Sequence, residues 1–216
     1  MTSRTLRVSS VAPGTKPLDG RIAARLAAVL AATPITPNQV TTVGLVIGMA
    51  AAALYALGGA AVHVGAALYV AAGLIDHTDG ELARLTGRST AFGQAYDRIV
   101  DLCVKSAVFV GMGIGFRDGP LGLVAPLLGL VASLAFLAIF SLRRRLARRV
   151  GQVAFAQPAA GPFEIEDILY LVAPLTWCGW VQPFLLAAAV GAPLFALWTM
   201  RQLWRVERDQ RSNRRM

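Results

Sequence analysis

Long apolar stretches with little charge fill most of this chain and leave few folds open to it. Of its 216 residues, 56% are hydrophobic and 15% are charged, and the mean hydropathy is +0.57. A helix needs about 20 apolar residues to cross the hydrocarbon core of a bilayer, and soluble domains are less apolar than this chain. The sequence therefore predicts an all-α integral membrane protein with six transmembrane helices, at 40–57, 60–75, 97–116, 121–142, 168–180 and 184–201.

Arginine and lysine gather on one side of the predicted membrane. They lie before the first helix, between the second and third, after the fourth and after the sixth, whereas the connections on the other side hold only Arg117. By the positive-inside rule, both termini and the connection between the second and third helices face the cytoplasm. A bacterial inner membrane is the expected location. The net charge of +9 is then a signal of topology, reinforced by attraction to anionic lipid, and not a sign of nucleic-acid binding.

An amphipathic segment precedes the first predicted span. Residues 18–32 alternate an apolar face with Arg21 and Arg25, which predicts a helix lying at the membrane surface. Pro34 and Pro37 should end it, because a proline disfavours helix in the residue before it. The predicted organisation is a disordered start at 1–17, this interfacial helix, a six-helix domain at 36–204 and a basic cytoplasmic tail at 205–216.

Four aspartates stand where the second predicted helix ends and the third begins, in the pattern D-x2-D-G-x2-A-R-x8-G-x3-D-x3-D. Asp76 and Asp79 are three residues apart and Asp97 and Asp101 are four apart, so each pair projects from one face of a helix. Acidic groups at membrane depth are costly unless they face a polar cavity, pair or bind cations. The two faces are predicted to meet as a metal site. The plainer alternative is that the aspartates cap helices or form surface ion pairs.

The fixed positions of this pattern resemble the motif of the CDP-alcohol phosphotransferases, membrane enzymes that use a CDP-activated substrate to build phospholipid head groups. The resemblance implies two divalent ions, Mg²⁺ or Mn²⁺, which suit carboxylate ligands and can steady the attacking and leaving oxygens. It assigns Asp76, Asp79 and Asp97 to the metal ions. It also implies that Asp101 is the general base for the acceptor hydroxyl and shares in metal binding.

The same resemblance places a nucleotide against the small residues of the motif. A second stretch, T-P-N-Q-V-T at 36–41, resembles the T-P-N-x-[VI]-T found where the first membrane helix of many such enzymes starts. Small residues also allow close helix crossing, an arginine here satisfies the positive-inside rule, and an asparagine before an apolar run can be an N-cap. The implied nucleotide-binding residues are Asn38, Asp79, Gly80, Ala83, Arg84 and Gly93.

Cations at the ends of helices around the aspartates are candidates for holding an acceptor phosphate. Lys105 follows Asp101 by one helical turn and could equally form an ion pair with an aspartate. The arginines after the fourth helix could equally be a solvated membrane edge. Glu164, Glu166 and Asp167 lie nearby without an assigned role. The candidate acceptor-binding residues are Lys105, Arg143, Arg144, Arg145 and Arg201.

The predicted reaction moves a phosphatidyl group from CDP-diacylglycerol to the hydroxyl of a small polar alcohol and releases CMP. The T-P-N-x-V-T-x2-G opening leans toward inositol-type relatives, so inositol phosphate or another phosphorylated polyol is the favoured acceptor. One alternative is transfer of a head group from a CDP-linked alcohol to a lipid acceptor. Another, of a different class, is a cation transporter lined by aspartates, although ion passage has no need of the A-R-x8-G interval. A homodimer is what the resemblance implies.

Overall fold

The computed structural model describes residues 18–150 and 171–213, and all regular structure within them is helical. Three segments are long and apolar enough to cross a membrane by length and composition: Pro37–Leu57, Val124–Arg149 and Val181–Arg208. The prediction of an all-helical chain is confirmed for these residues, and three of the six expected spans meet that criterion. The helices are α1 (Leu18–Ala31), α2 (Pro37–Leu57), α3 (Ala61–Leu85), α4 (Ala91–Gly115), α5 (Val124–Val150), α6 (Val172–Trp177) and α7 (Val181–Asn213).

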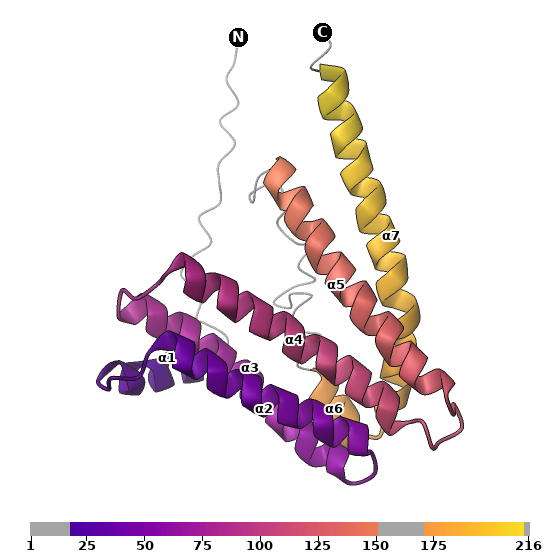
Figure 1. Cartoon of the computed structure of the whole chain (residues 1–216), viewed down its shortest axis with the longest axis horizontal. Helices are drawn as coiled ribbons and strands as arrows, with labels where there is room; N and C mark the ends of the chain where they lie inside the picture. Colours follow the sequence, from indigo (N-terminus) through magenta and orange to yellow (C-terminus); the bar gives the residue numbers. More distant parts are fainter. Residues whose placement is uncertain (1–17, 151–170, 214–216) are drawn as a thin grey trace.

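The helices form two groups that share α4. Helix α2 packs against both α3 and α4, and α1 lies along α3. Helix α5 packs against α4 and α7, and α5 and α7 diverge from the first group toward their C-terminal ends (Figure 1). The short α6 contacts α3 and α7, and the hydroxyls of Tyr55 in α2 and Thr176 in α6 lie 2.7 Å apart in the interior.

Glycines let α2 and α4 approach closely. A Cβ at Gly111 of α4 would collide with the carbonyl oxygen of Ala52 in α2. A Cβ at Gly48 of α2 would lie 2.5 Å from Cγ1 of Val104 in α4. Membrane helices use small residues in this way because lipid offers no hydrophobic drive for helix association, so close backbone packing must supply it. The register of α2 against α4, which positions the site described below, is therefore set by these residues.

Several helices extend beyond their apolar runs. Helix α4 begins at Ala91 and not at the predicted 97, because the Thr90 side chain caps it by accepting a hydrogen bond of 2.9 Å from the Gly93 amide. Helices α5 and α7 run well past their predicted ends at 142 and 201, and their extensions interact through an ion pair of 3.9 Å between Arg149 and Glu207. Hydropathy alone underestimated these helices, because their last turns are polar but still packed against each other.

The start of α2 corrects one prediction. Thr36 is the N-cap: its hydroxyl accepts from the Gln39 amide at 3.4 Å, and the Gln39 side chain accepts from the Thr36 amide at 2.8 Å. This reciprocal pair is a capping box, with Pro37 at the first helical position. Asn38 lies inside the first turn, so the reading of Asn38 as an N-cap is wrong. Because Thr36 caps the helix, the Asn38 side chain is not needed as a cap.

Helix α1 agrees with the predicted segment 18–32 and ends just before the proline-containing connection. Its Ala23 and Ala27 are fully buried. The start at 1–17, the beginning of the predicted fifth span, and Glu164, Glu166 and Asp167 lie outside the described residues.

Candidate active site

Asp79 is the most buried of the four motif aspartates. It lies on α3, 3% exposed, and its Oδ2 accepts a hydrogen bond from the hydroxyl of Thr41 on α2, which is itself buried. Thr41 has the carbonyl of Pro37 as a second possible acceptor, at 3.1 Å. A buried carboxylate needs such a donor, because an unpaired one pays a large desolvation cost. The T-P-N-Q-V-T stretch and the acidic motif are thus joined by a direct contact.

Asp97, Asp101 and Lys105 follow one another along one face of α4. The ammonium of Lys105 lies 2.8 Å from Oδ1 and 2.9 Å from Oδ2 of Asp101, so it holds both carboxylate oxygens. The two side chains are only 19% and 26% exposed. The plainer prediction for Lys105, an ion pair with an aspartate, is confirmed. This pairing fixes the position of the Asp101 carboxylate beside the other acids.

The carboxylates of α3 and α4 face each other. Asp97 makes a side-chain hydrogen-bond contact with Asp76, and the charges of Asp79, Asp97 and Asp101 all act on Asp76, opposed by Lys105. Two ionised carboxylates repel, so a contact of this kind requires a proton or a cation between them. Arg84 and Arg98 add positive charge from the edges, near Asp79 and Asp97 respectively. The structure therefore brings all four predicted acids into one interacting cluster.

The donor set of this cluster fits a hard divalent cation. It offers carboxylate oxygens, which are the ligands that Mg²⁺ and Mn²⁺ prefer, and an excess of negative charge that a cation would relieve. Across residues 18–150 and 171–213, no three His, Cys, Asp or Glu side chains already converge closely enough on one point to hold a metal ion. The acids are of the right chemical kind and lie close enough together to bind a divalent cation. Their side chains do not yet surround one point as the ligands of a bound ion would.

Asn38 and Gly93 meet at the neighbouring end of α2 and α4. A Cβ at Gly93 would lie 3.0 Å from Oδ1 of Asn38 and 3.1 Å from Oγ1 of Thr90, tighter than ordinary contacts. Close by, the hydroxyls of Thr42 and Tyr96 lie 3.0 Å apart and tie the same two helices together. Two residues predicted to bind a nucleotide, far apart in sequence, are thus adjacent beside the acid cluster.

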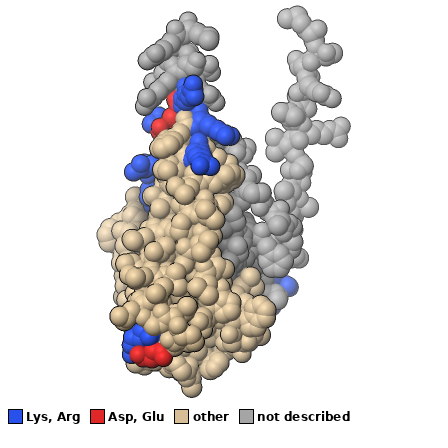
Figure 2. Space-filling view, turned by 90° about the vertical axis from the view of Figure 1, so that its right-hand side faces the viewer, with Lys and Arg blue, Asp and Glu red and all other residues tan. Residues whose placement is uncertain are grey.

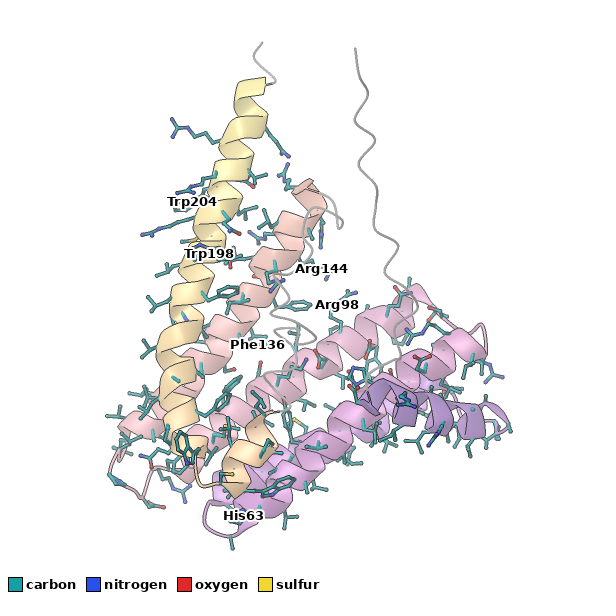
Figure 3. The ribbon with its side chains drawn as sticks, turned by 180° about the vertical axis from the view of Figure 1, so that it is seen from behind. His63, Arg98, Phe136, Arg144, Trp198 and Trp204 are labelled. Carbon is teal, nitrogen blue, oxygen red and sulfur yellow. The ribbon has the colours of Figure 1, made fainter. Side chains whose placement is uncertain are left out.

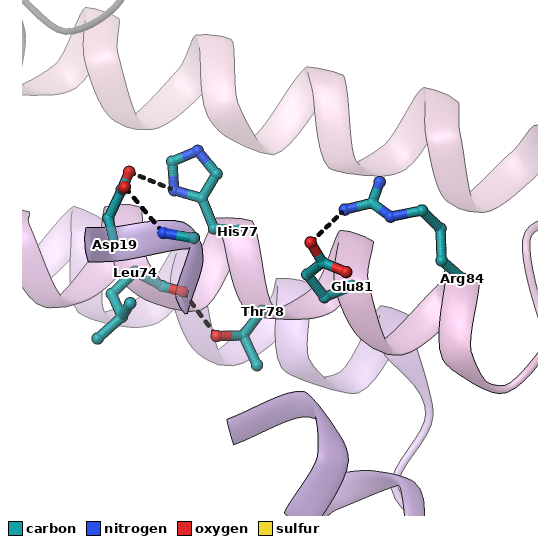
Figure 4. A network of polar contacts seen from close by, with 7 residues as sticks. Asp19, Leu74, His77, Thr78, Glu81 and Arg84 are labelled. Atoms are coloured by element: carbon teal, nitrogen blue, oxygen red, sulfur yellow. Dashed lines mark hydrogen bonds and ion pairs between the residues drawn. The ribbon is translucent and has the colours of Figure 1, made fainter. Parts of the chain in front are cut away.

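Gly80, Ala83 and Arg84 line one side of the last turns of α3. A Cβ at Gly80 would meet only the Arg84 guanidinium, at the ordinary distance of 3.7 Å. No other helix presses on Gly80, so the alternative of a tight helix crossing does not explain this glycine. Arg84 is 66% exposed on its side chain and pairs with Glu81 at 3.3 Å (Figure 4). Ala83 is half-buried beside them.

His77 points away from this cluster. Its Nδ1 lies 3.7 Å from Oδ2 of Asp19 on α1, as Figure 4 shows. The histidine thus links the first helix to α3.

The predicted acceptor-binding cations are distributed over three helices. Arg144 on α5 is fully exposed and feels the positive charges of Arg98 on α4 and Arg148 one turn on. Figure 3 shows Arg98 and Arg144 approaching each other between the two helices. Arg145 and Arg201 are exposed, Arg201 on α7 beyond α5, and Arg143 is partly buried. Like charges brought together repel unless an anion lies between them.

Sequence reasoning missed two contributors to this site. Arg98 follows a motif aspartate directly, but nothing in its spacing predicts that it would approach Arg144 on another helix. Thr41 was noted as part of its stretch, yet its contact with Asp79 needs the packing of α2 on α3. The signal for Thr41 was present, since a hydroxyl inside an apolar run is an available donor.

Comparisons with known proteins identify a family and several similar proteins. A family model described as CDP-alcohol phosphatidyltransferase matches residues 34–199. Archaetidylinositol phosphate synthase of Methanothermobacter thermautotrophicus is 38% identical over 97 residues, 44% of this chain and 49% of that protein. The protein of the same name from Pyrococcus horikoshii is 33% identical over 92 residues, 42% of this chain and 47% of that one. The chain thus spans about half the length of these curated relatives.

The fold itself is shared with a solved enzyme. The crystal structure of phosphatidylinositol phosphate synthase from Mycobacterium tuberculosis with CDP-DAG bound superimposes with a TM-score of 0.67, at 22% identity, over 85% of this chain and 94% of that one. The same enzyme in complex with manganese and citrate gives a TM-score of 0.65 at 23% identity, over 84% of this chain and 88% of that one.

Proposed function

This chain belongs to the CDP-alcohol phosphatidyltransferase family, and from that membership we propose that it transfers a phosphatidyl group from CDP-diacylglycerol to a phosphorylated polyol and releases CMP. The observation that carries the proposal is the cluster of four carboxylates on α3 and α4, joined to α2 through Thr41. A cation transporter would not require the adjacent Asn38 and Gly93, or a glycine at position 80 against which no other helix packs.

In the proposed site, Asp76, Asp79, Asp97 and Asp101 would hold two divalent ions, Mg²⁺ or Mn²⁺. These ions would neutralise the pyrophosphate of the donor and stabilise the charge that develops on the leaving phosphate. The Thr41 hydroxyl orients the Asp79 carboxylate. Such partners of metal-binding groups typically matter for affinity because they fix which oxygen is presented.

Asp101 is the proposed general base. It removes the proton from the acceptor hydroxyl, so that the oxygen attacks the phosphorus bearing the diacylglycerol while CMP departs. Lys105 holds Asp101 in place from one side, and the remaining lone pairs of the carboxylate stay open to a hydroxyl. Three residues are proposed to contact the departing nucleotide. Asn38 offers a side-chain amide, Gly93 lets the nucleotide approach the backbone, and Arg84 offers a positive charge.

The phosphate of the acceptor is proposed to lie between Arg98 and Arg144. The two guanidinium groups approach each other from α4 and α5, and an anion between them would convert their repulsion into two charge-assisted hydrogen bonds. The similar proteins are archaetidylinositol phosphate synthases and a phosphatidylinositol phosphate synthase, which favours inositol phosphate as the acceptor.

We further propose that the membrane spans are six in number and contain α2, α3, α4, α5, α6 and α7. Helices α3 and α4 are long enough, at 25 residues each, but carry the acids within their length. Both termini and the acid cluster would face the cytoplasm of a bacterial cell, with α1 at the surface of the inner membrane. A homodimer remains a prediction from the family.

Released CMP provides the test. Purified protein with CDP-diacylglycerol and Mn²⁺ is expected to release CMP with inositol phosphate, and much less with free inositol, glycerol phosphate or serine. Asp97→Asn should abolish this release, and Mn²⁺ should raise the melting temperature of the parent protein but not of the variant, by linkage of binding to folding. CMP release that is unchanged by a chelator would contradict the metal role. Equal release with every alcohol would contradict inositol phosphate as the specific acceptor.

A further inference from the structure

Helix α7 presents two different faces where it continues past its apolar part. Its inner face stays against α5: Leu203 and Thr199 are buried, Glu207 pairs with Arg149, and the Gln210 side chain donates a hydrogen bond of 3.1 Å to the Arg149 carbonyl. Glu207 is therefore turned inward and engaged. The helix remains docked well beyond the predicted end of its span, so its outer side chains have a fixed direction.

The outer face of α7 changes character along its length. Leu194 is 61% exposed, and it is followed by exposed Trp198 and Trp204, which are marked along α7 in Figure 3. Arg201, Arg205 and Arg208 are exposed on the same side, since these positions repeat at intervals of three or four residues. We name Trp198, Arg201, Trp204, Arg205 and Arg208 the α7 basic face. Apolar, then aromatic, then basic is the order in which a bilayer changes from hydrocarbon to head groups.

The dimensions of α7 match this order. Trp180, 63% exposed, stands just before the helix and marks the opposite interface. At 1.5 Å per residue, Trp198 lies about 27 Å and Arg205 about 38 Å along the helix from Trp180, against a hydrocarbon core of about 30 Å and a full bilayer of about 40–45 Å. Figure 2 shows a broad uncharged surface between a mostly basic group of side chains at its top and a small charged group at its bottom. The three arginines thus fall at head-group level.

We propose that the α7 basic face is a binding site for anionic phospholipid head groups, in the leaflet into which the ends of α5 and α7 project. Three cations side by side, with the nearby Glu207 turned inward, attract phosphate and repel a second copy of the same face. Trp198 and Trp204 place their rings at the boundary where indoles prefer to lie. This site is separate from the acid cluster, and the inference does not depend on the reaction proposed above.

The chain's four tryptophans make the proposal measurable. In a Trp177→Phe, Trp180→Phe background, only Trp198 and Trp204 fluoresce. The protein is placed in nanodiscs of phosphatidylcholine and phosphatidylglycerol, with brominated acyl chains on one lipid or the other at constant composition. We expect quenching to report phosphatidylglycerol enriched at least about twofold over its mole fraction. The reciprocal background, Trp198→Phe with Trp204→Phe, should show no enrichment at the other interface.

Substitutions then assign the effect to the face. Replacing Arg201, Arg205 and Arg208 together by Gln should return the lipid composition to its bulk value, whereas replacing them by Lys should preserve the enrichment. A charge-matched control replaces Arg211, Arg214 and Arg215 by Gln. This control should retain the phosphatidylglycerol enrichment. Equal loss in that control would mean bulk charge attraction and overturn the site, as would no enrichment in the parent. If the Gln variant fails to fold, the parent protein is measured at about 1 M salt, which screens charge interactions. Phosphatidylglycerol enrichment that is unchanged at this salt concentration would also overturn the proposed site.

Discussion

Replacing Thr41 by valine tests how the acid cluster is organised. The change removes the hydroxyl that donates to Oδ2 of Asp79 and keeps the shape of the side chain, in a place where both residues are buried. A hydrogen bond to a charged group is worth about 1.5–3 kcal/mol. Loss of a group that orients a metal ligand typically costs about 10–100-fold in metal affinity. The two estimates agree, because about 1.4 kcal/mol corresponds to a tenfold change.

The assay is CMP release as a function of Mn²⁺ concentration at saturating donor. Thr41→Val should raise the half-saturating Mn²⁺ concentration about 10–100-fold, while Thr41→Ser, which keeps the hydroxyl, should stay close to the parent. Thr42→Val is the matched control, since Thr42 bonds to Asn38 and Tyr96 and to no carboxylate. An unchanged metal dependence in Thr41→Val would refute the view that this contact presents Asp79 to the ions.

Four further substitutions probe the other parts of the site. Asp101→Asn should lower the rate of CMP release about 10²–10⁴-fold yet leave donor binding with metal nearly intact; a variant that loses all donor affinity would exclude the role of general base. Gly93→Ala should raise the KM for CDP-diacylglycerol, because its Cβ would lie 3.0 Å from the Asn38 side chain; an unchanged KM would place the nucleotide elsewhere. Arg98→Gln and Arg144→Gln should each raise the KM for the acceptor far more than that for the donor, and equal small changes in both constants would mean that these arginines do not hold the acceptor.

The acid cluster could be predicted from the sequence because its geometry is local. Intervals of three and four residues place Asp76 with Asp79, and Asp97 with Asp101, on single helix faces whatever the rest of the chain does. That the two faces meet follows from a short connection between consecutive helices. The ion pair of Lys105 with Asp101 was equally predictable, since Lys105 lies one turn after Asp101 on the same helix.

Contacts between helices that are distant in sequence could not be predicted in the same way. Arg98 approaches Arg144 only because α4 packs against α5, and a pattern of residue types does not encode that crossing. The ends of α5 and α7 were predicted wrongly for a related reason. The polar ends of α5 and α7 stay packed against each other, with Leu146 and Leu203 buried and Arg149 paired with Glu207, whereas hydropathy detects only the part that lipid would cover.

The position of the acid cluster depends on packing far from the acids themselves. Thr41 reaches Asp79, and Asn38 reaches Gly93, only if α2 keeps one register against α3 and α4. That register is set deeper in the bundle, where the Gly111 backbone lies against Ala52 and Gly48 leaves space for Val104. A side chain at either glycine would move α4 away from α2 and separate groups that must act within hydrogen-bond distance. The small residues of the apolar interior thus contribute to the geometry of the polar site, although none of them can touch a substrate there.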